Sequence, residues 1–307
     1  MNRVAPGDVR VIATTAPATI RSDLAGAVRI GISGWRYPPW RGTFYPPKLA
    51  QRLELAYASE RMRSIEINGS FYALQRPSSY QAWYEQTPAA FVFTVKGPRF
   101  ITHMKKLRDV DVPLANFFAS GVLALADKLG PILWQLPPML TFDAARLADF
   151  FARLPRTTVG AAALATQHDA RLDDRALTVT DADRPLRHAL EIRHASYVDP
   201  AFPALLSEHD IGLVVADTAG KWPQLFDVTA DFVYVRLHGD QELYVSGYSD
   251  EALDSWAERV RGWTSGSTTP DGVGRDVYAY FDNDVKVRAP YDAMALRRRL
   301  QTAPVSA

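Results

Sequence analysis

Eight short runs of β-branched and aromatic residues alternate with longer helical patterns, and this alternation restricts the possible folds more than any other feature of the chain. The strand candidates are residues 28–34, 64–70, 91–97, 131–136, 187–194, 212–218, 231–239 and 276–283. Helical patterns fill most of the gaps, at 47–60, 78–86, 113–128, 143–154, 200–209, 250–263 and 291–300. Strands separated by helices pair in parallel, because a helix makes each return crossing.

The number of strands favours a closed barrel over an open, doubly wound sheet. Eight parallel strands close a (β/α)8 barrel. An open sheet normally carries a glycine-rich phosphate loop between its first strand and the next helix. The segment GISGWR at 31–36 leads into no helical pattern. We therefore predict an α/β fold consisting of a single (β/α)8 TIM-type barrel, which 307 residues can accommodate.

The first part of the chain differs from the rest. Residues 1–27 follow neither a helical nor a strand period and contain Pro6, Pro17 and scattered arginines. We predict a disordered tail over 1–27 and one barrel domain over 28–307. Two further segments, 156–185 and 264–274, are rich in turn-forming or polar residues and are predicted to be irregular. No apolar run resembles a secretory signal or a membrane span, so we expect a cytoplasmic protein without membrane contact.

Composition excludes several classes of function. The chain has no cysteine, which removes disulfides, cysteine-bound metals and thiol nucleophiles. Lys and Arg number 35 against 34 Asp and Glu, so the net charge is +1. A chain with that balance does not attract nucleic acid through bulk charge, although a local basic cleft remains compatible with it.

Charged side chains fall late in several strand candidates, on the face opposite to the more apolar one. Side chains alternate along a strand, and the apolar face has to meet the surrounding helices. We therefore expect the charged face to look into the barrel, near the C-terminal mouth where barrel active sites lie. The set is Glu66, Lys96, Glu191, Arg193, Asp217, Arg236 and His238. Three acids against three strong bases predict that most of these charges are paired with one another, because unpaired buried charges are costly.

The chain resembles the YecE-like family, domain-of-unknown-function family seventy-two, a family of TIM-barrel type. The resemblance rests on RIGISGW at 29–35, EIN at 66–68 with FY at 71–72, Lys96 with ITH at 101–103, EIRHASY at 191–197, YVRLHG at 234–239 and YFDN at 280–283. Two positions depart from the family pattern: Tyr197 replaces a tryptophan and Asp282 replaces an amide. The resemblance implies a barrel with a polar cavity and brings no established reaction.

We expect these residues to bind and act on an anionic ligand at the mouth of the barrel. As catalytic candidates we name Glu191 and His238 for proton transfer, with Lys96 and Glu66. As substrate-binding candidates we name Arg193, Arg236, Asn68, Trp35, His103, Asn283 and Tyr280. A phosphate or carboxylate group would suit the two arginines. The expected partner is a small anionic molecule or a nucleotide, the expected activity is a phosphoester hydrolase or lyase, and no cofactor is required.

Lys96 has two interpretations. Cationic neighbours that lower its pKa would make it a Schiff-base amine. Carboxylates on the other strands of the same mouth favour a salt bridge instead, and we predict the salt bridge.

Two alternative functions remain open. Glu191, Asp217 and His238 come from consecutive strand candidates and form an oxygen and nitrogen set that suits a divalent metal, which predicts a metal-dependent isomerase or endonuclease. Arg193 and Arg236 would repel that cation.

The second alternative is a non-catalytic module that binds nucleic acid or another ligand through the loop after the first strand. This loop holds the aromatic rings Trp35, Tyr37, Trp40, Phe44 and Tyr45, with Arg36 and Arg41 at its edge. Nucleic acid is not the favoured partner. We predict that the loop packs as a lid with one or two rings exposed.

Overall fold

The computed structural model describes residues 26–301 of the chain and shows a closed barrel of eight parallel strands. The strands are β1 (Val28–Ser33), β2 (Ser64–Ile67), β3 (Val92–Lys96), β4 (Leu129–Gln135), β5 (His188–Glu191), β6 (Ile211–Asp217), β7 (Phe232–Leu237) and β8 (Asp276–Phe281). Each strand pairs with the next one along the chain, and β8 pairs with β1 to close the cylinder. The predicted α/β barrel is therefore confirmed, with a strand at each of the eight predicted places.

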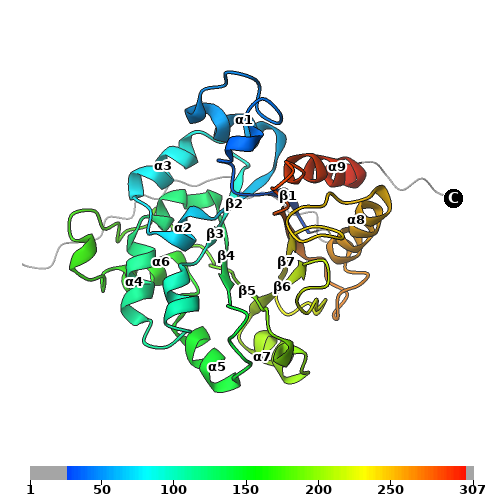
Figure 1. Cartoon of the computed structure of the whole chain (residues 1–307). Helices are drawn as coiled ribbons and strands as arrows, with labels where there is room; N and C mark the ends of the chain where they lie inside the picture. The colour runs from blue at the N-terminus through cyan, green and yellow to red at the C-terminus, as the bar shows by residue number, and fades with distance from the viewer. Residues whose placement is uncertain (1–25, 302–307) are drawn as a thin grey trace, which may run out of the picture.

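Helices surround the barrel on its outer side (Figure 1). They are α1 (Glu54–Arg61), α2 (Gly69–Tyr72), α3 (Pro77–Glu85), α4 (Asp111–Ala119), α5 (Ala144–Arg153), α6 (Thr158–Ala165), α7 (Ala201–Glu208), α8 (Asp250–Ser265) and α9 (Ala289–Gln301). Short 3₁₀ segments are η1 (Pro38–Trp40), η2 (Gln51–Leu53), η4 (Val122–Lys128), η5 (Ala170–Leu172) and η6 (Ala195–Tyr197), and η3 (Phe100–Met104) is a single π-helical turn. Helix α5 shows why these segments become helices: Asp143 caps its first turn, and Leu147, Phe150 and Phe151 form a buried stripe.

Three helix predictions need correction. The helix predicted over 47–60 begins as an α-helix only at Glu54, after the 3₁₀ segment η2. The segment 156–185 was predicted to be irregular, but α6 lies within it, capped by the Thr157 side chain. Its buried face consists of alanines, which give no strong amphipathic pattern in the sequence. The helix predicted over 113–128 ends at Ala119, because Gly121 takes a left-handed conformation (φ 110°) and the chain continues as the 3₁₀ segment η4.

The predicted disordered tail, apart from Gly26 and Ala27, lies outside the described residues. Those two residues are anchored: the Gly26 amide donates to the Thr264 carbonyl and the Ala27 amide to Asp276. The division into a tail and one domain stays a prediction. No helix within residues 26–301 has the length and apolar character that a bilayer crossing requires.

The barrel interior is filled in layers. Below the mouth it contains a buried cluster of apolar and tyrosine side chains, among them Val92, Leu133, Ala189, Val214, Ala216, Phe232, Tyr234, Tyr278 and Tyr280. At the amino-terminal end, Arg187 pairs with Asp231 and Asp276 and closes the floor. The opposite end, where the strands finish, holds the buried charges.

Candidate functional site

Arg236 on β7 lies at the centre of the charged cluster at the carboxyl end of the barrel. Its guanidinium contacts three carboxylates from three other strands: Glu66 at 2.8 Å, Glu191 at 2.8 Å and Asp282, directly after β8, at 2.9 Å. Arg236, Glu66 and Glu191 are fully buried. Burial alone would lower the pKa of Arg236, but the three carboxylates raise it well above its usual range, so the guanidinium stays charged.

Glu66 is enclosed by donors. Its carboxylate accepts hydrogen bonds from Ser33 and from the Tyr234 hydroxyl (2.6 Å), besides its bonds to Arg236. Asn68 donates to the Ser33 hydroxyl at 2.7 Å, while its own side-chain oxygen is buried without a hydrogen-bond partner among the described residues. Glu66 therefore fixes Arg236, and Asn68 presents the unsatisfied atom of this group.

A second set of titratable groups lies beside Arg236. His238 is fully buried, with Nδ1 3.1 Å from Asp282 Oδ2. Burial and the neighbouring Arg236 lower the pKa of His238, so its imidazole is neutral. Arg236 and His238 lower the pKa of Asp282 to about 2 against the effect of burial. Burial and the charge of Asp282 raise the pKa of Asp284 well above its usual range, and Asp284 Oδ1 is buried with no hydrogen-bond partner in the part of the chain that the structure describes.

Arg193 and Lys96 form the cationic rim of the cluster. Arg193 Nε donates to Glu191 at 2.9 Å, and its guanidinium lies over the Trp222 ring, 4.1 Å from the centroid. Lys96 Nζ lies over the Phe71 ring, 4.4 Å from the centroid. Lys96 is 8% exposed, and the side chains of Arg193 and Asp282 are 11% and 16% exposed. Solvent therefore reaches the cluster along this rim, above the fully buried Arg236.

The predicted salt bridge of Lys96 is wrong. Among residues 26–301 no carboxylate oxygen lies within 4.0 Å of its ammonium nitrogen. The carboxylates that were expected to pair with it are bound by Arg236 and Arg193. His103, on η3, packs edge-on against the same Phe71 ring. Burial, Lys96 and Arg193 lower the pKa of His103 to about 4, so its imidazole is neutral as well.

Asp217 does not join the cluster. Val214 and Ala216 point into the barrel, so Asp217 faces the surrounding helices, where it accepts a hydrogen bond from Tyr248 at 3.2 Å. Within the described residues no group of three or more His, Asp or Glu side chains is placed to hold a metal ion. The metal set of Glu191, Asp217 and His238 is therefore not assembled, because its members lie on opposite faces of the sheet.

Three predicted substrate-binding residues also lie away from the rim. Gly34, in a left-handed conformation (φ 79°), turns the chain after β1, and Trp35 packs edge-on against Trp83. Asn283 faces outward and donates to Asp292 and to the Ser246 carbonyl. Tyr280 points inward but lies deeper, hydrogen-bonded to Ser64.

The aromatic loop after β1 packs as a lid, as predicted. Trp40, Phe44 and Tyr45 are buried and contact one another, and only Tyr37 among the rings of this lid keeps partial exposure. The Tyr37 hydroxyl donates to the Ser33 carbonyl at 2.6 Å, which ties the lid to the edge of the charged cluster. Arg41 pairs with Glu54 rather than facing solvent alone.

The comparisons with known proteins decide the family. A family model described as "Protein of unknown function DUF72" matches residues 29–307. The chain belongs to the DUF72 family. The resemblance inferred from the motifs is thereby confirmed.

Relatives of this DUF72 chain share parts of its sequence and its fold. The UPF0759 protein YunF of Bacillus subtilis is 31% identical over 116 residues, which are 36% of this chain and 40% of YunF. The UPF0759 protein YecE of Escherichia coli K12 is 32% identical over 113 residues, 36% of this chain and 38% of YecE. These alignments thus span about two-fifths of each relative.

Solved structures give the same result over most of the chain. A DUF72 family protein from Thermotoga maritima has a TM-score of 0.69 and 25% identity, covering 90% of this chain and all of that one. A DUF72 family protein from Enterococcus faecalis has a TM-score of 0.66 at 16% identity and covers 90% of this chain and 96% of that one. The second likeness concerns the fold alone.

Several residues in or beside the charged cluster were not predicted as site residues. They are Ser33, Tyr37, Trp222, Tyr234, Tyr244, Asp282 and Asp284. The alternation along β8 could have found Asp282, since it shares a face with Tyr278 and Tyr280. Trp222 and Tyr244 lie on loops far along the chain, and no local pattern in the sequence places them over Arg193.

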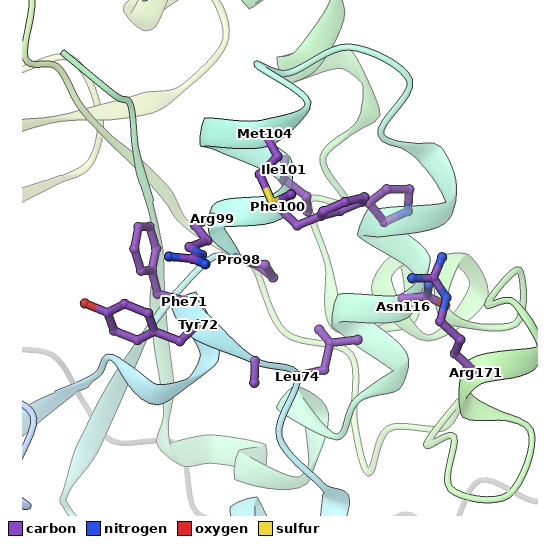
Figure 2. Close-up of a pocket in the computed structure, with 12 residues that line it drawn as sticks. Phe71, Tyr72, Leu74, Pro98, Arg99, Phe100, Ile101, Met104, Asn116 and Arg171 are labelled. Atoms are coloured by element: carbon purple, nitrogen blue, oxygen red, sulfur yellow. The ribbon is translucent and has the colours of Figure 1, made fainter. Parts of the chain in front are cut away.

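A cavity of about 250 Å³ lies beside the cluster, between α2, η3 and α4. Figure 2 shows Arg99 next to Phe71 and Tyr72, and Arg171 approaching Asn116 from the other side. The other residues that line the cavity are mostly apolar. Phe71 belongs to this cavity and also lies beneath Lys96, so the cavity adjoins the rim.

We predict that Glu191 stabilises the barrel at neutral pH and that this contribution to the unfolding free energy is lost in acid. Burial alone would raise the pKa of Glu191, but Arg193, Arg236, His238 and Lys96 hold it well below its usual range. A carboxyl whose folded pKa is depressed contributes stability above its unfolded pKa of about 4.3, and this contribution is lost as the pH falls. Urea unfolding at pH 6 and pH 3 should show the advantage of wild type over Glu191→Gln shrinking by on the order of 1–2 kcal/mol. An unchanged difference would mean that Glu191 is not held ionised.

Proposed function

We propose that this DUF72 chain binds a small molecule carrying a phosphate or carboxylate group at the Lys96–Arg193 rim and hydrolyses it or cleaves it by elimination. The observation that carries the proposal is the unequal use of the three cations. Arg236 is saturated by three carboxylates, whereas Arg193 contacts one carboxylate and Lys96 none within 4.0 Å among the described residues. Positive charge is therefore available at the exposed edge and not at the buried centre.

The geometry of Arg193 suits an anion. Its Nε bond to Glu191 and its stacking on Trp222 fix the plane of the guanidinium. Within residues 26–301 its Nη2 donates only to the Tyr244 hydroxyl, at the long distance of 3.4 Å. A guanidinium fixed on one side and open on the other can donate two parallel hydrogen bonds to a phosphate or carboxylate.

The carboxyl pair beside Arg236 can move protons. The pKa of Asp282 is lowered to about 2 and the pKa of Asp284 is raised well above its usual range, because Arg236 acts on the first and burial and the charge of Asp282 act on the second. Such a divided pair supplies a base and an acid at the same pH. Glu191 and His238, our sequence candidates for proton transfer, are fully buried. We therefore assign the proton transfers to Asp282 and Asp284, and give Glu191 and His238 the role of positioning Arg193 and Asp282.

Thermal unfolding in the presence of anions tests the binding step. Inorganic phosphate, phosphomonoesters, nucleoside monophosphates and short carboxylic acids are the probes. A ligand at 100 times its Kd should add about 2.7 kcal/mol to the unfolding free energy, which is about 5–10 °C in Tm. Arg193→Gln should abolish the shift, while Arg108→Gln, at an exposed position outside the cluster, should keep it.

The outcomes separate binding from chemistry. A shift that survives in Arg193→Gln would place the anion elsewhere, and no shift with any probe would reject the proposal. Release of phosphate or of an unsaturated product from a bound probe, lost in Asp284→Asn with binding retained, would support the assigned proton donor. A shift produced only by oligonucleotides would favour a nucleic-acid binding module instead.

A further inference from the structure

Lys96 occupies an unusual position for a lysine. It is the last residue of β3, and its side chain ends inside the carboxyl mouth of the barrel with 8% of the residue exposed. The Phe71 ring lies 4.4 Å from its nitrogen on one side. Burial removes the amine from most of the solvent at the rim of the cluster, while the face of the Phe71 ring favours its charged form.

The carboxylates around Lys96 do not form an ion pair with its ammonium group. Glu66, Glu191 and Asp282 all act on it from a distance, but their oxygens are bound by guanidiniums and by hydroxyl groups. Within residues 26–301 no hydrogen bond to a protein acceptor holds the ammonium group in place. The other cation that faces it, Arg236, repels its charged form.

The balance of these effects increases the fraction of neutral amine. Burial and Arg236 lower the pKa of Lys96 to about 8, although the three carboxylates oppose the change. About half of the amine is then unprotonated at pH 8, whereas an ordinary lysine with a pKa of about 10.4 has well under about 1%. Desolvation and a cationic neighbour are the two conditions that make a lysine nucleophilic.

We propose that Lys96 condenses with the carbonyl group of a small aldehyde or ketone whose phosphate or carboxylate is held by Arg193. This rests on the anion site proposed above and narrows its substrates to carbonyl compounds. Arg193 and Lys96 both lie near Glu191 and His103, which places the two functions on one side of the mouth. The reaction class becomes a carbon–carbon or elimination lyase, because a protonated imine stabilises a carbanion on the adjacent carbon.

The condensation joins the neutral amine of Lys96 to the carbonyl carbon and releases one water. The lone pair of the neutral amine attacks the carbonyl carbon, and one N–H proton moves to the former carbonyl oxygen to give a carbinolamine. That hydroxyl takes a proton from solvent and leaves as water while the nitrogen lone pair forms the C=N bond. Amine, carbonyl compound and one proton thus give a protonated imine and one water. Hydrolysis reverses these steps and restores Lys96.

Reductive trapping tests the proposal on the whole protein. Dihydroxyacetone phosphate and pyruvate are incubated with the protein and cyanoborohydride, which adds hydride to the imine carbon and leaves a stable secondary amine. Peptide mass spectrometry should find the adduct on Lys96, with a rate that saturates in probe and levels off above about pH 8. Exposed Lys48 and Lys106 serve as internal references whose labelling should not saturate.

Two variants and a neutral probe complete the design. Lys96→Arg keeps the charge and should remove the adduct while Lys48 and Lys106 react as before. Dihydroxyacetone should label Lys96 at least about tenfold more slowly than its phosphate, since a charge-assisted hydrogen bond to Arg193 contributes that much. Arg193→Gln should erase this preference without slowing the neutral probe.

Each result decides the proposal. Labelling of Lys96 no faster than Lys48 with every probe overturns it. If anions raise Tm in an Arg193-dependent way while Lys96 stays unlabelled, the nucleophile is rejected and the anion site stands. If the neutral probe labels Lys96 selectively but no anion is preferred or raises Tm, the anion site fails and the reactive amine stands alone.

Discussion

Arg236→Met is expected to lower the unfolding free energy by about 3–5 kcal/mol, the cost of leaving buried charges without their partner. Arg236 is the shared partner of Glu66, Glu191 and Asp282, and the first two carboxylates are fully buried. Methionine fills a similar volume, so the loss reports on charge rather than on packing. For a domain of this size the change corresponds to a fall in Tm of roughly 10 °C, measured by calorimetry or by circular dichroism.

A second substitution makes this prediction sharper. In the otherwise wild-type protein, Glu191→Gln should lower the unfolding free energy, because it removes a carboxylate partner of Arg236 and Arg193. In the Arg236→Met background the same change should cost clearly less, because Glu191 there has already lost Arg236 and keeps its pair with Arg193. Arg236→Lys, which keeps the charge with fewer donors, should fall between wild type and Arg236→Met. The account is wrong if Glu191→Gln costs as much in the Arg236→Met background as it does in the otherwise wild-type protein.

Gly31→Ala is expected to cost more than about 3 kcal/mol and at least several degrees in Tm. Gly31 lies in the middle of β1, paired with Ser64 on β2 and with Tyr280 on β8. A methyl group there would overlap the carbonyl oxygen and carbon of Ser64, which are backbone atoms. A backbone held in a closed barrel cannot move aside as a side chain can, so the strands have to separate.

Gly69→Ala is the matched control for this prediction. A methyl group at Gly69 would meet only the end of the Gln75 side chain, at 3.3 Å, and that side chain can move. We expect a change within about 1 kcal/mol, of either sign. Equal losses in Gly31→Ala and Gly69→Ala would show that the close approach of β1 and β2 is not what requires glycine.

Most of the charged cluster was predictable because alternation along a strand is a local property. Six charged residues were expected on inward faces, and their contacts and mutual charge effects show that they lie together. They are Glu66, Lys96, Glu191, Arg193, Arg236 and His238. The same rule failed for Asp217 on β6. Both faces of that strand are apolar, as is common in parallel strands buried on two sides, so the pattern could not tell inside from outside.

Residues beyond the ends of the strands were the least predictable. Trp35 follows β1 by two positions, but the turn at Gly34 directs it toward Trp83 instead of the mouth. Asn283 and Tyr280 were both predicted to bind substrate, although they differ by an odd number of positions and cannot share a face. The structure turns Asn283 outward to Asp292 and keeps Tyr280 deep in the barrel.

The eight strands, their parallel order and the face that carries most charges can be inferred from the chain alone, because period and spacing are local and a barrel follows from their repetition. How those charges are divided follows from the three-dimensional arrangement of the strands. Three carboxylates meet at Arg236 because β2, β5, β7 and β8 bring them within bonding distance across the cylinder. Lys96, from β3, is left beside Phe71 with no carboxylate in contact among the described residues. Which cation has carboxylate partners and which has none among residues 26–301 depends on distances across the closed barrel, and no local pattern encodes those distances.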